Sequence, residues 1–96
     1  MKIIQWAEAR KIIPNSTPET QLLKAVSEPG ELADATIKKD RDEVVDAVGD
    51  VMVCLVNYCA LQDISLVECM EVAYDQIKNR RGTLLPNGLF VKSLGE

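Results

Sequence analysis

The polar residues best suited to chemistry form a stripe along one predicted helix. Four of them fall within roughly one 60° sector of a helix that turns about 100° per residue: Glu43, Asp46, Asp50 and Asn57. Nearly every other residue from position 47 to 61 is apolar, so we expect protein to surround this helix on most sides. A carboxylate such as Asp50 is costly to bury unless it is paired or bound to a metal ion. The pattern therefore predicts a salt bridge or a metal ligand at this position.

A matching stripe precedes it in the chain. Lys24, Glu28 and Glu31 share one helical sector, opposite the apolar residues Leu22, Val26, Ala33 and Ile37. If the two helices are neighbours, four acids converge: Glu28, Glu31, Asp46 and Asp50. Carboxylate oxygens suit Mg²⁺ or Mn²⁺. The chain has no histidine, and its cysteines lack metal-ligand spacing, so a zinc site is not expected.

Both stripes also fit plainer roles. Acids at i, i+3 and i+4 spacing usually form a solvated helix face, which is the alternative for Glu28 and Glu31 taken alone. For Asp50, the alternative is a structural salt bridge to Lys24 or Lys78.

Composition narrows the class of protein. The chain has 96 residues, which predicts one domain with a modest core, and a chain of this size often gains core by forming a homodimer or tetramer. Its net charge of −4 weighs against a nucleic-acid partner. The absence of histidine excludes Ser-His-Asp and Cys-His catalysis.

The cysteines and the apolar segments indicate a cellular setting. Cys54, Cys59 and Cys69 all fall in apolar helical sequence, so we expect small core residues in a reducing compartment. The longest apolar run, residues 51–56, is too short to span a bilayer. No signal peptide is recognised, and the expected location is cytoplasmic, without a membrane partner.

Capping residues and breakers divide the chain into helices. We expect a short helix over residues 2–13 and a second from Pro18, after the cap Thr17, to about residue 39. A third should cover residues 41–62 after Asp40, and a fourth should run from Ser65 to residues 80–82. The turn signal at residues 86–88 predicts a turn or small hairpin in the tail. Short connections favour an antiparallel four-helix arrangement.

Two segments resemble a known family. SEPGELA at residues 27–33 and DAVGDVM at residues 46–52 are similar to motifs of the MazG-like all-α nucleoside triphosphate pyrophosphohydrolases. Their pattern is Glu-x-x-Glu on one helix and Glu-x-x-Asp on the next. The likeness extends from residues 5–7 through 78–82 to 90–92, as in short, single-domain members that include those of phages. Both stripes in order are a far stronger signal than one acidic pair.

The resemblance implies a fold and an activity. The fold is an all-α, four-helix bundle with a short C-terminal extension, covering residues 1–96 as a single domain and completed by oligomerisation. The activity is Mg²⁺-dependent hydrolysis of ribo- or deoxynucleoside triphosphates to the monophosphate and pyrophosphate, with Mn²⁺ as a substitute. Cleansing of the nucleotide pool is the biological role that this implies.

Metal ligands carry over residue by residue. Glu28 and Glu31 match the family's first acidic pair and would hold metal and activate water, and Asp50 matches its final aspartate. The family's second glutamate falls at Ala47 here, so we expect Asp46 to take its role, with Glu43 as the alternative. Pro29 lies inside the first motif, which predicts either a kink at the site or a slightly displaced Glu28.

Six residues are expected to bind substrate: Trp6, Lys24, Asn57, Tyr74, Lys78 and Arg81. Lys78 and Arg81 match a basic cluster that would hold phosphates, or they complement a helix C-terminus. Trp6 would stack on the base, or anchor the core.

The remaining candidates are less specific. Asn57 offers amide groups to a base, and Tyr74 would line the cleft or pack in the core. Lys92 would contact a phosphate or solvent. From another class of function, the same bundle would serve as a weakly active or inactive module that oligomerises or docks a partner.

Overall fold

The computed structural model describes residues 1–93. It contains two compact units, Met1–Leu66 and Val67–Glu96, and each is described by itself.

Two short helices begin the N-terminal unit: α1 (Lys2–Ala9) and α2 (Ile12–Asn15). The single helix expected over residues 2–13 is divided because Lys11 adopts a left-handed conformation with φ of 61°, which ends one helix and begins the next. Both helices contact α4. The side chain of Ala7 is completely buried, which allows α1 to lie close to its neighbour.

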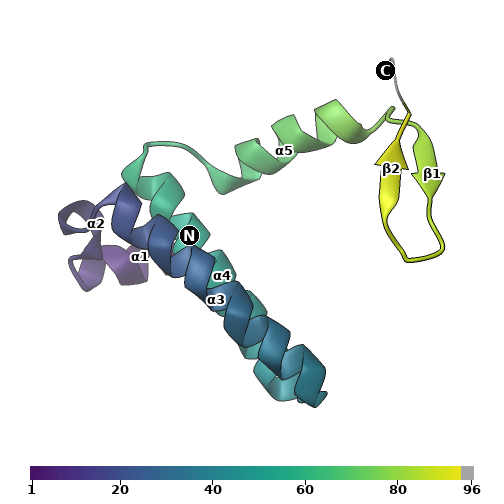
Figure 1. Cartoon of the computed structure of the whole chain (residues 1–96). Coiled ribbons are helices and arrows are strands. Elements are labelled where there is room, and N and C mark those ends of the chain that lie inside the picture. The colour runs from purple at the N-terminus through teal and green to yellow at the C-terminus, as the bar shows by residue number, and fades with distance from the viewer. Residues whose placement is uncertain (94–96) are drawn as a thin grey trace. The chain divides into compact units, whose positions relative to one another are not determined.

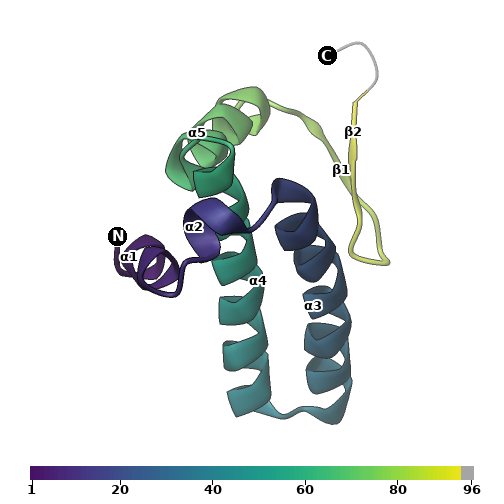
Figure 2. The same ribbon diagram turned by 90° about the vertical axis from the view of Figure 1, so that its left-hand side faces the viewer.

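The centre of this unit is a hairpin of two long helices, α3 (Pro18–Lys38) and α4 (Arg41–Leu61), which lie side by side along their lengths (Figures 1 and 2). Thr17 Oγ1 accepts a hydrogen bond of 3.2 Å from the backbone N–H of Thr20, and Asp40 Oδ1 accepts one of 3.1 Å from that of Glu43. Both are N-caps of the expected kind. These helix starts are confirmed at the residues that the sequence predicted.

Small side chains make the core of the N-terminal unit. The buried apolar residues are Ala7, Ala25, Ala35, Ala47, Cys54, Val56 and Cys59. The expectation of buried cysteines is thus confirmed for Cys54 and Cys59. Larger aliphatic side chains stay outside it: Leu23 is 71% exposed and Ile37 is 79% exposed. The unit by itself therefore leaves much apolar surface in contact with water.

Helix α4 is apolar enough to be compared with a membrane span. Its most apolar 18-residue window has a mean hydropathy of 1.7, so by length and composition alone it is able to cross a bilayer. A mostly buried core helix of a soluble protein passes the same test, and 28% of this window is buried inside the structure. Because α3 packs beside α4 and Asp50 lies near its middle, we interpret α4 as a core helix.

The C-terminal unit contains α5 (Leu66–Ile77) and an antiparallel hairpin of β1 (Gly82–Leu84) and β2 (Phe90–Lys92). Helix α5 ends at Ile77, earlier than the expected residues 80–82. The hairpin confirms the turn expected at residues 86–88, where Gly88 has a φ of 90°. Among the described residues α5 has no buried side chain. The prediction that Cys69 is a core residue is therefore wrong for this chain: its side chain is exposed.

The expected fold class is confirmed: helices make up most of the described chain, with a short C-terminal extension. The four expected helical segments are all present, the first as two short helices. That the 96 residues act as one domain stays a prediction.

Candidate metal centre

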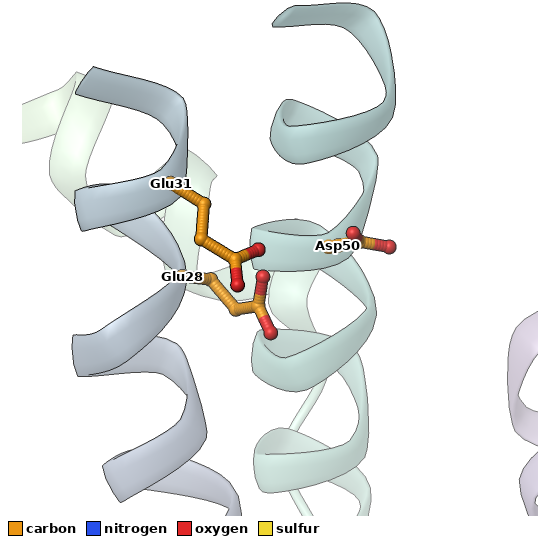
Figure 3. Close-up of side chains that lie close together, drawn as sticks. All are labelled: Glu28, Glu31 and Asp50. Atoms are coloured by element: carbon orange, nitrogen blue, oxygen red, sulfur yellow. The ribbon is translucent and has the colours of Figure 1, made fainter. Parts of the chain in front are cut away.

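Three carboxylates meet between α3 and α4. Glu28 and Glu31 lie one turn apart on α3 and extend towards α4, which carries Asp50 (Figure 3). One oxygen atom from each side chain lies within 4.8 Å of the other two. The structure thus brings together three of the four acids that the two stripes predict.

The local sequence explains why these side chains approach one another. Ala35 and Ala47 are buried between the helices, and their small side chains let the two backbones come close. Pro29 has no backbone N–H to donate, yet α3 continues through it to Lys38. Glu28 therefore keeps its helical position beside Glu31 rather than being displaced.

The neighbouring carboxylates disfavour ionisation of Glu28. The pKa of Glu28 is raised above its usual value of 4.5, first by hydrogen bonding with the Glu31 carboxyl and then by burial. The negative charges of Glu31 and Asp50 raise it further, while Lys24 lowers it. Oε2 of Glu28 is buried and has no hydrogen-bond partner among the described residues. This oxygen is the kind of orphaned acceptor that a bound cation satisfies.

The donor set fits a hard divalent cation. Oxygen atoms on opposite sides of one Mg²⁺ ion lie about 4.2 Å apart, twice the usual Mg–O distance. The limit of 4.8 Å within which the three oxygens of the cluster lie is close to this value. All three donors are carboxylates, the ligands that Mg²⁺ and Mn²⁺ prefer.

A hollow of about 350 Å³ adjoins the cluster and is strongly acidic. It is lined by five acids: Glu31, Asp34, Glu43, Asp46 and Asp50. Asp46 and Glu43, the two alternatives for the third ligand, thus both lie in this hollow but outside the close triad. A polyanion can approach so negative a surface only together with cations.

Three further residues of this hollow bear on the predicted site. Ala47 lines it at the position where the family pattern has a glutamate. Asp34 and Lys38 also line it, and the sequence reasoning missed both. Both residues share the helix face of Glu31, at three and seven residues beyond it. Extending the stripe along α3 for two more turns would have found them.

Two polar groups on the next turns of α4 have different surroundings. Asn57 is only 3% exposed, and its Oδ1 has no hydrogen-bond partner among residues 1–93. Burial raises the pKa of the Cys54 thiol, which therefore stays protonated and does not join the carboxylates as a thiolate ligand. Lys24 influences both Glu28 and Cys54 by its charge but forms no ion pair with a described residue.

Trp6 is not the core anchor that one interpretation expected. Its side chain is 46% exposed. The guanidinium of Arg10 lies over its ring, 5.6 Å from the ring centroid, in a cation–π contact.

The other predicted substrate residues belong to the C-terminal unit. Tyr74 is exposed, and Lys78 Nζ forms an ion pair of 3.1 Å with Asp75 rather than with an acid of the stripes. A second hollow of about 410 Å³ is lined by Gln76, Asn79, Arg80 and Lys92. Lys92 lies opposite Gly82 in the strand register, which brings it near the end of α5. Arg81 is not among the lining residues of this hollow, whereas its neighbour Arg80 is, and the role of Arg81 in binding phosphates stays a prediction.

Comparisons with known proteins identify relatives. The model of the MazG nucleotide pyrophosphohydrolase domain matches residues 16–84. An uncharacterised 18.2 kDa protein in the rep-hol intergenic region of Haemophilus phage HP1 (strain HP1c1) is 41% identical over 54 residues. That match covers 56% of this chain and 33% of the phage protein, so the chain corresponds to about a third of its relative. No solved structure matches the chain.

Proposed function

Because the chain belongs to the MazG nucleotide pyrophosphohydrolase family, we propose that it is a Mg²⁺-dependent enzyme that hydrolyses nucleoside triphosphates to the monophosphate and pyrophosphate. The single observation that carries this proposal is the triad of Glu28, Glu31 and Asp50, whose oxygens lie within 4.8 Å of one another. Family membership alone leaves open whether a member keeps its metal ligands, and here three carboxylates are in place.

The carboxylates would have distinct tasks. Glu28, Glu31 and Asp50 would hold the cation, which would supply an acidified water and neutralise charge on the phosphates. Glu28 or Glu31 positions the attacking water or takes its proton. Water attacks the α- or β-phosphorus, and pyrophosphate is released.

Substrate contacts outside the triad stay predictions. Lys78 and Arg81 are proposed to hold phosphates, and the pair formed by Lys78 and Asp75 on the surface is weak enough to yield to such a ligand. Lys24 contributes positive charge next to Glu28. For Asn57, the buried Oδ1 without a partner supports a role that needs a hydrogen-bond donor.

Self-association is part of the proposal. Leu23, Val26 and Ile37 on α3 are 71%, 69% and 79% exposed, and the C-terminal unit exposes several more apolar side chains. Apolar surface of this kind commonly marks an interface. A homodimer or tetramer would cover it, with nucleotide-pool cleansing in the cytoplasm as the proposed setting.

A second candidate is a weakly active or inactive helical module. Ala47 favours it, because an alanine lines the acidic hollow at a position where the family pattern supplies a glutamate. Such a module would keep the exposed apolar surface and lose metal-dependent turnover.

A product assay separates the two candidates. The protein is incubated with Mg²⁺ and a panel of ribo- and deoxynucleoside triphosphates, and pyrophosphate, phosphate and monophosphate are measured. We expect pyrophosphate and monophosphate in equal amounts, and a loss of about a hundredfold or more in Asp50→Asn, the scale of a removed catalytic electrostatic contact. Release of single phosphates would indicate a phosphatase instead. Equal turnover by parent and variant would exclude the role of Asp50.

A further inference from the structure

A third hollow, of about 370 Å³, lies where α1 packs on α4. It is lined by Lys2, Ile3 and Trp6 from α1 and by Asp50 and Val53 from α4. Its volume falls within the roughly 300–1,000 Å³ of pockets that hold small molecules. The residues from α1 lie outside the segment 16–84 that the family model matches.

Asp50 connects this hollow to the candidate metal centre. The same side chain belongs to the carboxylate triad and lines both the acidic hollow and the hollow beside Trp6. A ligand that reaches from one to the other therefore has a phosphate end next to the cation and a planar, apolar end next to Trp6. A nucleoside triphosphate has these two ends.

Trp6 has the properties of a stacking platform rather than of a core residue. Nearly half of its side chain is exposed although it is the largest apolar group in the chain. Arg10 lies over the indole ring, and the exposed part of the side chain remains accessible to a planar ligand. Ile3 and Val53 supply aliphatic contacts beside it, and Lys2 supplies a hydrogen-bond donor for acceptor atoms at the edge of a base.

We propose that the hollow between α1 and α4 binds the base of the nucleoside triphosphate, with Trp6 stacked on it. This inference rests on the proposed function. It separates Trp6 from Asn57, the other predicted base contact, which is buried and does not line the hollow.

The test uses Trp6 as its own reporter, because it is the only tryptophan of the chain. Two ligands are titrated with Mg²⁺: an α,β-methylene nucleoside triphosphate, whose scissile bond resists hydrolysis, and inorganic triphosphate, which has no base. We expect the nucleotide analogue to change the tryptophan fluorescence and inorganic triphosphate to leave it unchanged, although calorimetry detects the binding of both.

Variants distinguish stacking from a structural role. By calorimetry, Trp6→Ala should weaken binding of the nucleotide analogue by roughly 5- to 150-fold, the range for a stacked base, and leave the affinity for inorganic triphosphate unchanged. Trp6→Phe should restore most of the lost affinity, since it keeps an aromatic face. Circular dichroism of each variant verifies that the helices are intact, and Trp6→Phe keeps the test valid should the alanine variant not fold.

Several outcomes would overturn the inference. Unchanged affinity of Trp6→Ala for the nucleotide analogue excludes stacking while leaving the proposed function in place. Equal weakening for both ligands shows a structural role. Fluorescence that depends on protein concentration without ligand shows that a second copy of the chain fills the hollow. If neither ligand binds the parent protein, the proposed function itself fails, and the inference fails with it.

Discussion

Asp50→Asn is the substitution that most directly tests the candidate metal centre. It removes one negative charge and keeps the shape of the side chain, so packing between α3 and α4 should be preserved. A cation that binds only the folded chain stabilises it by mass action. Replacing one of three carboxylate ligands should therefore remove that stabilisation without unfolding the protein.

The expected change in Tm on Mg²⁺ binding follows from the affinity for the ion and the size of the domain. At a free Mg²⁺ concentration ten times the Kd, binding stabilises the fold by about 1.4 kcal/mol. For a domain of this size, 1 kcal/mol moves the Tm by about 4–8 °C, so the parent protein should gain about 6–11 °C. Loss of an outer partner of a metal ligand typically weakens affinity by about 10- to 100-fold. If loss of a direct ligand weakens it about a hundredfold, the shift in the variant falls below about 0.5 °C.

The rise in Tm caused by Mg²⁺ is measured by thermal melting, once with a chelator that removes divalent cations and once with Mg²⁺ at matched ionic strength. The rise is then compared between the parent protein and Asp50→Asn. Asp42→Asn is the matched control, because it changes the same residue type on α4 outside the acidic hollow. It should keep the full shift with Mg²⁺. Asp46→Asn tests the remaining sequence prediction, and since Asp46 lies outside the triad we expect a smaller loss than for Asp50→Asn. A parent protein that gains no stability from Mg²⁺, or an Asp50→Asn variant that gains as much as the parent, would refute the assigned site.

Four further predictions use other parts of the structure. When a chelator removes divalent cations, the raised pKa of Glu28 gives stability that is complete below about pH 4.5 and is lost as the pH rises through the pKa of the folded state. Urea unfolding should therefore show that the free energy of unfolding of the parent, minus that of Glu28→Gln, falls as the pH rises. A difference that rises with pH would contradict the cause given for the shift. Ala47→Glu adds a carboxylate to the acidic hollow, so calorimetry should show Mg²⁺ affinity rising by about tenfold or more. The free energy of unfolding measured with a chelator present should drop. Unchanged Mg²⁺ affinity would place position 47 outside the coordination sphere. A Cβ added at Gly49 would meet nothing within 4 Å, so Gly49→Ala should stabilise the chain by up to about 1 kcal/mol in urea unfolding. A loss of stability would show instead that another copy of the chain packs against this position. A Cβ at Gly82 would lie 2.7 Å from Phe90 Cζ and 2.8 Å from Lys92 Cα, so Gly82→Ala should abolish the protection of the β-hairpin amides in hydrogen exchange and leave α3 and α4 protected.

Helix starts were predictable from the sequence because capping is local chemistry. Thr17 and Asp40 each satisfy a backbone N–H three residues later, and no distant contact is needed to place them. The stripe geometry was predictable for a similar reason. Helical spacing fixes which residues share a face, and the short connection at Lys39 and Asp40 makes α3 and α4 neighbours. Together these two facts are enough to bring Glu28 and Glu31 opposite Asp50.

Features that depend on less regular contacts were not predictable. The break after Ala9 comes from the left-handed Lys11, a residue type with no strong preference for that conformation. The exposure of Cys69 depends on which faces of α5 are covered, and its apolar neighbours in the sequence do not report that. The hollow beside Trp6 depends on how α1 docks on α4, which the sequence of either helix alone does not determine.

The location of these sites suggests that metal binding and base recognition are separable. The triad is built entirely from α3 and α4, and both helices lie within the segment that matches the family. The hollow beside Trp6 also needs α1, which lies before that segment and shares only Asp50 with the triad. Under the proposed assignment of the base to this hollow, a change in α1 would alter which base is accepted without moving a metal ligand. Substitutions at Ile3 should accordingly shift preference among nucleotides more than they shift Mg²⁺ affinity, whereas substitutions at Asp50 should affect both.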